Sequence, residues 1–174
     1  IPIEGERKYV TILFSDMSGY TTMSERLYPE DIKDITSSIF EEIPKIVTKY
    51  EGFIEKFVGD ALMSIFGATR ASEDDPIRAI KAAIEIHSFV ESTSPQYEKK
   101  IGQPLSMHTG INTGLVVTGE INLEKGSHGL AGDTINLAAR LSSLGEKGDI
   151  LVGSDTYAHA EGYFDFEMLE ARTV

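Results

Sequence analysis

The order of apolar and polar residues along the chain predicts strands and helices in alternation. An unbroken apolar and β-branched run covers residues 9–14, which is typical of a buried central strand. The stretch from Phe53 to Phe66 consists of two shorter apolar runs joined at Gly59-Asp60. Glycine readily adopts the positive φ that a tight two-residue turn needs, so this stretch predicts a β-hairpin.

Apolar residues at helical spacing predict three longer helices. The first begins at Pro29, and Pro44 inside it predicts a kink, because proline lacks a backbone donor and clashes with the preceding turn. The second begins at Asp75-Pro76, and the third runs from the cap Asp133 to Gly145. The residues expected on the buried faces are Ile32, Ile35, Ile39, Ile43 and Ile46, then Ile77, Ile80, Ile84 and His87, then Leu137, Leu141 and Leu144.

Further strand-like runs follow the second helix. Residues 105–111 and 115–121 resemble a pair of strands, with residues 112–114 (Asn-Thr-Gly) as the turn between them. The shorter elements expected near the end are a strand at 149–152, a helix at 154–160 and a last strand at 163–169. Together these elements favour an α+β fold, with a mixed, mostly antiparallel sheet and helices packed on it.

Length, composition and charge limit the classes of function. The chain has 174 residues, and we expect a single domain over 1–174 in which 1–6 are a linker. A net charge of -12 argues against non-specific binding of nucleic acid or of anionic membrane surfaces. The absence of cysteine excludes disulfides and thiolate metal sites. No apolar run reaches membrane-spanning length, and the chain starts at Ile1 without Met, so we expect a cytoplasmic domain cut from a longer protein.

Two carboxylates are expected at the ends of neighbouring strands. Asp16 ends the first strand, where a helix is expected to start near Ser18, and Asp60 lies at the tip of the hairpin. Taken singly, Asp16 is better explained as a helix cap and Asp60 as a turn residue. Mg²⁺, however, binds one or two protein carboxylates together with substrate phosphates. With Lys56 four residues before Asp60, the two acids point to a site for a metal and a nucleotide.

Three other polar residues have two interpretations each. Lys56 is either an edge residue with a solvated ammonium group or a donor to a nucleotide base. Asn136 and Arg140 are four residues apart and share one helix face, which is either an ordinary surface or a recognition face beside the small Ala138 and Ala139. The chain has no Walker A loop, dinucleotide fingerprint, HExxH or GxSxG motif, so hydride transfer, zinc proteolysis and serine hydrolysis are poorly supported.

Four motifs, in order, resemble those of the catalytic domain of class III nucleotidyl cyclases, from near Arg7 to the end of the chain. They are residues 13–21 (LFSDMSGYT), 55–60 (EKFVGD), 110–114 (GINTG) and 132–140 (GDTINLAAR). The resemblance implies a ferredoxin-like βααβ core and the formation of a cyclic nucleotide and pyrophosphate from a nucleoside triphosphate. It also implies in-line attack of the ribose 3′-hydroxyl on the α-phosphate with two Mg²⁺ ions, for which Mn²⁺ can substitute.

The same resemblance assigns roles to individual residues. Asp16 and Asp60 would be metal ligands, with the Met17 carbonyl as an extra one, while Asn136 would orient the ribose and Arg140 would stabilise charge on the α-phosphate. The backbone that would cradle the terminal phosphates belongs to Ser18, Gly19, Tyr20 and Thr21. The resemblance further implies a two-fold homodimer, in which one chain supplies the metal acids and the other supplies Lys56, Asn136 and Arg140, and a regulatory domain elsewhere in a longer protein.

Base choice in this family depends on two positions. Lys56 is the residue typical of adenylyl cyclases at the first, where guanylyl cyclases typically carry Glu. The second falls at Gly129, where adenylyl cyclases usually have Thr or Asp. The chain also ends at Val174, before the usual final strands and a phosphate-binding Lys. We therefore expect an adenylyl cyclase that converts ATP to cyclic AMP with weakened base selectivity. A non-catalytic, cyclase-like nucleotide-binding or regulatory module and a guanylyl cyclase are the alternatives.

Overall fold

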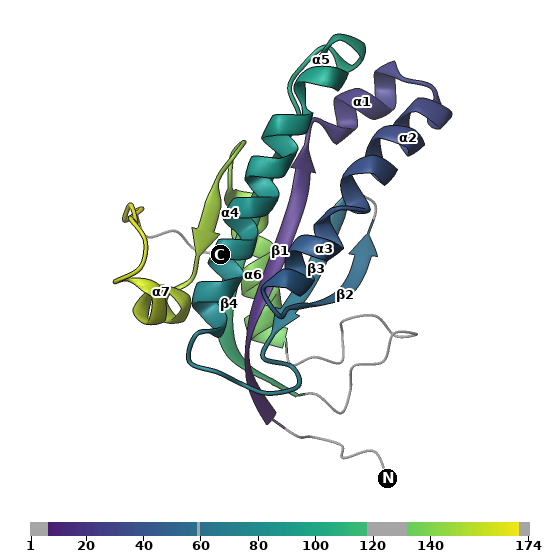
Figure 1. Ribbon diagram of the computed structural model, residues 1–174. Helices are drawn as coiled ribbons and strands as arrows, with labels where there is room; N and C mark the ends of the chain where they lie inside the picture. Colours follow the sequence, from purple (N-terminus) through teal and green to yellow (C-terminus); the bar gives the residue numbers. More distant parts are fainter. Residues whose placement is uncertain (1–6, 59, 118–131, 171–174) are drawn as a thin grey trace.

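Five strands form one mixed sheet in the computed structural model, which describes residues 7–58, 60–117 and 132–170 (Figure 1). The strands are β1 (Arg7–Ser18), β2 (Phe53–Val58), β3 (Ala61–Phe66), β4 (Ser106–Val117) and β5 (Ile150–Val152), in the spatial order β2-β3-β1-β4-β5. The pairs β2/β3, β3/β1 and β1/β4 are antiparallel, and β4/β5 is parallel. The expected α+β fold with a mixed, mostly antiparallel sheet is therefore confirmed.

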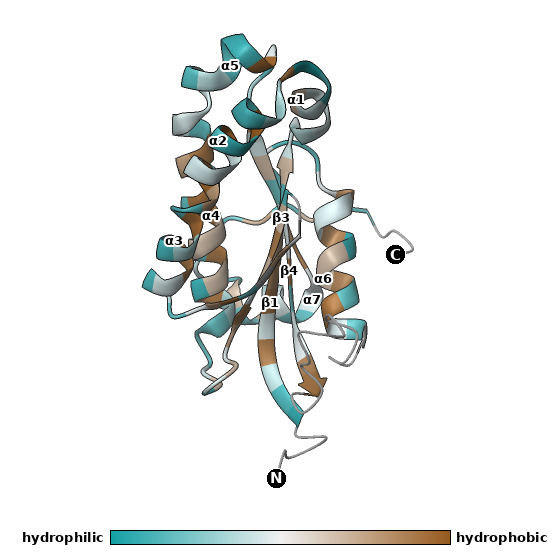
Figure 2. Cartoon of the chain, turned by 90° about the vertical axis from the view of Figure 1, so that its right-hand side faces the viewer, coloured by the Kyte–Doolittle hydropathy of each residue, from teal (hydrophilic) through white to brown (hydrophobic). Residues whose placement is uncertain are grey.

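Helices cover both faces of this sheet. They are α1 (Tyr20–Arg26), α2 (Pro29–Phe40), α3 (Ile43–Lys49), α4 (Asp75–Thr93), α5 (Pro95–Ile101), α6 (Gly132–Leu144) and α7 (Ser154–Ala160). Figure 2 shows α2, α3 and α4 on one side of the sheet and α6 on the other. The larger apolar core lies under α4 and includes Leu13 and Phe66, whereas the smaller core lies under α6 and includes Ile12 and Met63. None of the described helices is long and apolar enough to cross a membrane.

The central strand β1 is longer than the apolar run that predicted it. Its side chains alternate between the two cores, with Ile12 toward α6 and Leu13 toward α4, which explains why residues 9–14 contain no polar face. The strand continues through Asp16, which is paired with Ala61 on β3 and His108 on β4. Asp16 is thus a strand residue and not a helix cap.

The segment from β1 to β3 agrees with the prediction from sequence except at Pro44. The hairpin is confirmed, since β2 ends and β3 begins on either side of Gly59-Asp60 and Val58 pairs with Ala61. Gly59 itself lies outside the described residues. The helix expected to kink at Pro44 is instead two helices, α2 and α3, with Pro44 in the first turn of α3, where a missing backbone donor costs no hydrogen bond.

The turn expected at residues 112–114 was wrong, because β4 runs through them without a break. Asn112, Thr113 and Gly114 pair with Ile12, Thr11 and Val10 in the register with β1. The glycines of this motif instead allow helix α6 to lie close to the strand. A Cβ atom at Gly114 would come within 2.6 Å of the Thr134 hydroxyl, and one at Gly110 would collide with the backbone of Ala138 and Ser142.

Two expected buried faces were also wrong in part. On α6 the residues against the sheet are Ile135, Ala138 and Ser142, whereas Leu137 and Leu141 are half-buried and Leu144 is exposed. The glycines of β4 bring the helix so close that small side chains fit beneath it, and the leucines are turned outward. On α4, Ile77, Ile80 and His87 are buried as expected, but Ile84 is 44% exposed.

The last strand, expected at residues 163–169, is absent from the structure. These residues have irregular backbone, and Met168 and Leu169 are exposed. Phe166 packs edge-on against Tyr157 of α7, with ring centroids 5.1 Å apart, and against Phe164 at 6.1 Å. The alternating apolar residues that resembled a strand therefore form a small aromatic cluster on α7.

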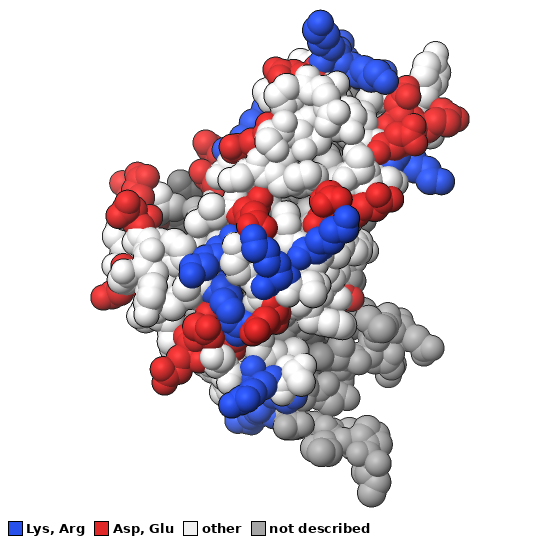
Figure 3. Space-filling model, in the orientation of Figure 1, with Lys and Arg blue, Asp and Glu red and all other residues white. Residues whose placement is uncertain are grey.

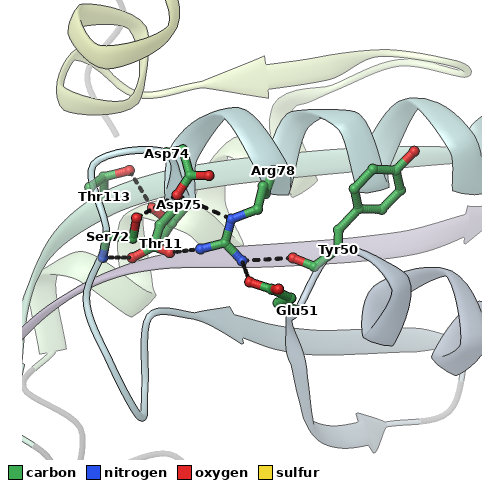
Figure 4. A network of polar contacts seen from close by, with 8 residues as sticks. All are labelled: Thr11, Tyr50, Glu51, Ser72, Asp74, Asp75, Arg78 and Thr113. Atoms are coloured by element: carbon green, nitrogen blue, oxygen red, sulfur yellow. Dashed lines mark hydrogen bonds and ion pairs between the residues drawn. The ribbon is translucent and has the colours of Figure 1, made fainter.

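A polar network fixes the start of α4, the long helix that covers one face of the sheet (Figure 4). Arg78 donates a hydrogen bond to the Tyr50 carbonyl oxygen (2.8 Å) and forms ion pairs with Glu51 (3.4 Å) and the buried Asp75. Asp75 also accepts a hydrogen bond from the Ser72 N–H group at 2.8 Å. Since Tyr50 and Glu51 follow α3, the network joins the end of α3 to the first turn of α4.

Candidate active site

The two acids predicted from the sequence lie together at one end of the sheet. The Asp60 carbonyl oxygen accepts a hydrogen bond from the Met17 N–H group at 3.1 Å, which places Asp60 beside the end of β1. The Asp16 carboxylate, on the side of the sheet that α6 covers, accepts a hydrogen bond from the Ser142 hydroxyl at 3.1 Å. The structure thus confirms that the hairpin tip meets the end of the first strand.

The electrostatics of this pair favour a cation. Burial raises the pKa of the Asp60 carboxyl group, and the neighbouring Asp16 raises it further, while a backbone hydrogen bond and, to a smaller extent, His108 oppose the shift. A divalent ion near both carboxylates would relieve their repulsion. Among the described residues there is no group of three or more His, Cys, Asp or Glu side chains that could enclose a metal. Carbonyl oxygens, water and phosphate would have to complete the coordination, which suits Mg²⁺ better than a metal that needs an all-protein cage.

His108 belongs to this end of the sheet, although the sequence did not predict it. It pairs directly with Asp16 across β1 and β4, and its Nδ1 atom lies 2.6 Å from the carbonyl oxygen of Ser142. Ser142 thus contacts both Asp16, through its hydroxyl group, and His108, through its carbonyl oxygen. The only signal in the sequence was that His108 precedes Gly110 by two positions, so that the His108 side chain points to the face of β4 on which Gly110 leaves room.

The turn after β1 is built around Gly19. Gly19 has φ of 93°, a left-handed conformation that L side chains rarely adopt, and its carbonyl oxygen accepts the first helical hydrogen bond of α1 from the Met23 N–H group at 3.0 Å. Ser18 is the last residue of β1, and α1 begins at Tyr20. The backbone from Ser18 onward therefore turns directly beyond the acid pair.

Ser18 also borders an open hollow beside the acid pair. Its other lining residues are His108, Gly145, Glu146 and Lys147, the last three of which follow helix α6. Neither Glu146 nor Lys147 was predicted as a site residue. Nothing in the sequence near them indicates a site, because only the antiparallel pairing of β1 with β4 and the position of α6 bring this loop to Ser18.

Asn136 and Arg140 do not face the acids of their own chain. Both are exposed on α6, while Ile135, Ala138 and Ser142 face the sheet. Within the described part of the chain, neither makes a hydrogen bond or ion pair with Asp16 or Asp60. Asn136 and Arg140 are thus exposed on one helix without contacting the acid pair of their own chain, and their expected role in recognition stays a prediction.

Of the two positions that we expect to read the base, the structure describes Lys56 but not Gly129. Lys56 lies on the edge strand β2, opposite Met63, directly after a register shift in the β2/β3 pairing. It is thus on the strand that leads to Asp60. Gly129 lies outside the described residues.

Comparison with known proteins agrees with this geometry. The family model described as the adenylate and guanylate cyclase catalytic domain matches residues 4–174. The adenylyl cyclase CyaB from P. aeruginosa has a similar structure, with a TM-score of 0.84, 33% identity and coverage of 92% of this chain and 84% of that one. The guanylyl cyclase Cya2 has a TM-score of 0.80, 36% identity and coverage of 91% and 81%.

Relatives by sequence alone include both kinds of cyclase. Human guanylyl cyclase C is 30% identical over 150 residues, which are 86% of this chain and 14% of that protein. The chain spans 15% of the length of the receptor-type guanylate cyclase gcy-23 of Caenorhabditis elegans and 38% of that of adenylate cyclase 2 of Rhizobium meliloti, both of which it matches. This chain belongs to the family of adenylate and guanylate cyclase catalytic domains. It is a class III cyclase domain, the type of lyase that forms cyclic nucleotides.

Proposed function

We propose that this domain is an adenylyl cyclase that converts ATP to 3′,5′-cyclic AMP and pyrophosphate. The observation that carries the proposal is the meeting of Asp16 and Asp60 at the end of the sheet, with the Met17 backbone between them. In the reaction the ribose 3′-oxygen forms a bond to the α-phosphorus and the bond from that phosphorus to the β-phosphate bridging oxygen breaks. The 3′-hydroxyl proton is lost, and pyrophosphate leaves.

Different residues of this chain have different roles in that reaction. Asp16 and Asp60, with the Met17 carbonyl, would hold divalent cations, Mg²⁺ or Mn²⁺, and such cations would supply positive charge to the attacking oxygen and to the leaving pyrophosphate. Ser142 holds the Asp16 carboxylate in place from α6. The backbone of Ser18, Gly19, Tyr20 and Thr21 provides N–H groups for the terminal phosphates, because the Gly19 turn leaves the first N–H groups of α1 without helical partners.

The exposed face of α6 supplies the second half of a site in a partner chain. Asn136 orients the ribose, and Arg140 stabilises negative charge on the α-phosphate in the transition state. Both are exposed and turned from their own acids, so a two-fold homodimer accounts for their position. The exposed Leu144, and the half-buried Leu137 and Leu141 at the border of this face, give apolar area for such a contact.

The choice of ATP over GTP rests on Lys56. An ammonium group donates to an adenine ring nitrogen, whereas the donor groups of guanine require an acceptor. Gly129 offers no side chain for a second contact with the base. We therefore expect a preference for ATP that is weaker, by about 1–3 kcal/mol of discrimination, than in relatives with Thr or Asp at this position. Relatives of both specificities leave a guanylyl cyclase as the second candidate.

The shared site is tested with two inactive variants in one dimer. Asp16→Ala and Arg140→Ala are co-expressed with different tags, and the doubly tagged dimer is purified. Each variant alone forms dimers in which both sites are damaged, whereas the mixed dimer has both lesions in one site and leaves the other whole. Its cyclic AMP formation should reach about half that of wild type. A mixed dimer as inactive as its parents would show that Arg140 does not act across a dimer interface.

A further inference from the structure

The hollow beside the acid pair contains one cationic side chain that no assigned role uses. Of the residues that line it, which are Ser18, His108, Gly145, Glu146 and Lys147, only Lys147 is a Lys or Arg. Ser18 lies two positions after Asp16 and so on the same face of β1, and His108 pairs with Asp16. Lys147 and the acid pair thus border the same end of the sheet.

The loop that carries Lys147 is held in place by its own backbone. The Gly148 N–H group donates to the Met107 carbonyl oxygen on β4, and the Asp149 N–H group donates to the Glu146 carbonyl oxygen, both at 2.9 Å. The Asp149 carboxylate accepts from the Glu146 N–H group, also at 2.9 Å. Lys147 therefore projects from a short, hydrogen-bonded loop, not from a long surface connection.

A buried histidine fixes the same loop from behind. His87 on α4 is 6% exposed, its ring lies beside the Gly148 backbone, and its Nε2 atom lies 2.7 Å from the Thr109 hydroxyl. The Thr109 hydroxyl in turn lies 2.8 Å from that of Ser15, the neighbour of Asp16. The Thr109 and Ser15 hydroxyls thus connect His87, which lies beside the Lys147 loop, to the strand end that carries the acid.

We infer that Lys147 binds the terminal phosphates of the substrate and the pyrophosphate product, an inference that rests on the proposed function. A lysine ammonium group binds phosphate oxygens as a point charge. The domain has a net charge of -12, so a triphosphate needs local positive charge in addition to cations at Asp16 and Asp60. The alternative is that Lys147 is only a solvated surface residue.

Binding of inorganic pyrophosphate, measured by calorimetry with Mg²⁺ present, separates the two. We expect Lys147→Ala to weaken pyrophosphate binding about tenfold, and Lys147→Arg to retain it, because both cations make charge-assisted bonds to phosphate. Lys81→Ala is the matched control, since Lys81 is an exposed lysine on α4 outside the hollow. In turnover assays Lys147→Ala should raise KM more than it lowers kcat.

The titration does not depend on catalysis, so the two claims fail separately. Pyrophosphate binding that depends on Lys147, in a protein that forms no cyclic nucleotide, would support this inference and contradict the proposed function. Cyclic AMP formation together with unchanged pyrophosphate affinity in Lys147→Ala would support the function and overturn the role of Lys147.

Discussion

Ser142 of helix α6 donates a hydrogen bond to the carboxylate of Asp16 on strand β1, with 3.1 Å between its Oγ atom and Oδ2. The two residues are 126 positions apart, and the contact exists because α6 lies directly against β4 at Gly110. Ser142 is fully buried, so its hydroxyl group has a fixed place. This hydrogen bond therefore connects Asp16, which we propose as a metal ligand, to the helix that carries the exposed Asn136 and Arg140.

The first prediction concerns this hydrogen bond. Among the described residues, Ser142 has the only hydroxyl group that donates a hydrogen bond to Asp16, and Ser142→Ala removes it. One such hydrogen bond contributes about 1 kcal/mol. We expect cyclase activity to fall by about two- to tenfold and the Mg²⁺ concentration for half-maximal activity to rise. Ser143→Ala, one position along on the exposed side of α6, is the control. Equal activity of the two variants across a Mg²⁺ titration would remove Ser142 from the site.

The second prediction concerns the acids themselves. Burial and the charge of Asp16 both oppose ionisation of Asp60, so Asp60→Asn removes a repulsive charge at little steric cost. Without metal, its Tm should equal or exceed that of wild type. Addition of Mn²⁺ should raise the Tm of wild type but not that of the variant.

Activity of Asp60→Asn and of Asp16→Asn should fall more than about a hundredfold, since even residues that only orient metal ligands typically account for about 10–100-fold. Asp34→Asn, at an exposed position of α2, controls for loss of one negative charge. Near-normal turnover in either site variant would remove that residue from the metal site.

The third prediction concerns the close approach of α6 to the sheet. Gly110→Ala places a methyl group against the backbone of Ala138 and Ser142, which cannot move as a flexible side chain would. We expect a loss of about 1–3 kcal/mol in the free energy of unfolding measured with urea, together with reduced activity. Gly162→Ala is the control, because a Cβ atom there would have no neighbour within 4 Å. A Gly110→Ala variant as stable as this control would contradict the packing described here.

The fourth prediction concerns pH. Burial lowers the pKa of His87 from 6.5 to about 4, with a smaller contribution of the same sign from His108 and opposing ones from the Gly148 backbone and Asp149. Between these two values the unfolded chain binds a proton that the folded chain does not. Stability from the neutral His87 is therefore complete above pH 6.5 and is lost as pH falls toward 4, by about 3 kcal/mol in all.

His87→Gln keeps a donor and an acceptor but does not titrate, so its unfolding free energy should fall less steeply over this range. Urea denaturation at pH 7.5, 6 and 5 measures the difference between the two slopes. Identical slopes for wild type and variant would show that His87 does not carry this pH dependence.

The central strand β1 and the hairpin of β2 and β3 were the parts of the sheet most readily predicted from sequence. A strand with both faces buried, such as β1, has no polar face, and a Gly-Asp pair between two apolar runs is a strong hairpin signal. Gly114 was misinterpreted as a turn because a glycine needed for close helix packing and a glycine needed for a turn look alike in one sequence. The leucines of α6 were misassigned for the same reason. Because the glycines of β4 bring the helix close to the sheet, its small side chains are buried and its leucines are not.

The sequence predicted that Asp16 and Asp60 lie close together, because elements near in the sequence carry them, but it did not predict the residues that distant elements bring near them. Asp16 lies on β1 and Asp60 in the turn between β2 and β3, and the pairing of these strands follows from a hairpin beside a central strand. His108 and Lys147 join them only through the β1/β4 register and the loop after α6. Figure 3 shows Lys, Arg, Asp and Glu side chains interspersed over the face of the molecule on which α2, α3 and α4 lie.

The most direct test of the central claim is product formation from ATP and GTP, side by side, by the purified protein with Mg²⁺ and with Mn²⁺. Asp60→Asn, purified in parallel, shows how much product comes from contaminating enzymes. The account predicts cyclic AMP and pyrophosphate in equal amounts, and a faster reaction with ATP than with GTP. Cyclic GMP formed at an equal or higher rate would contradict the role of Lys56. The absence of either cyclic nucleotide with both metals, from a folded protein, would contradict the proposed enzyme.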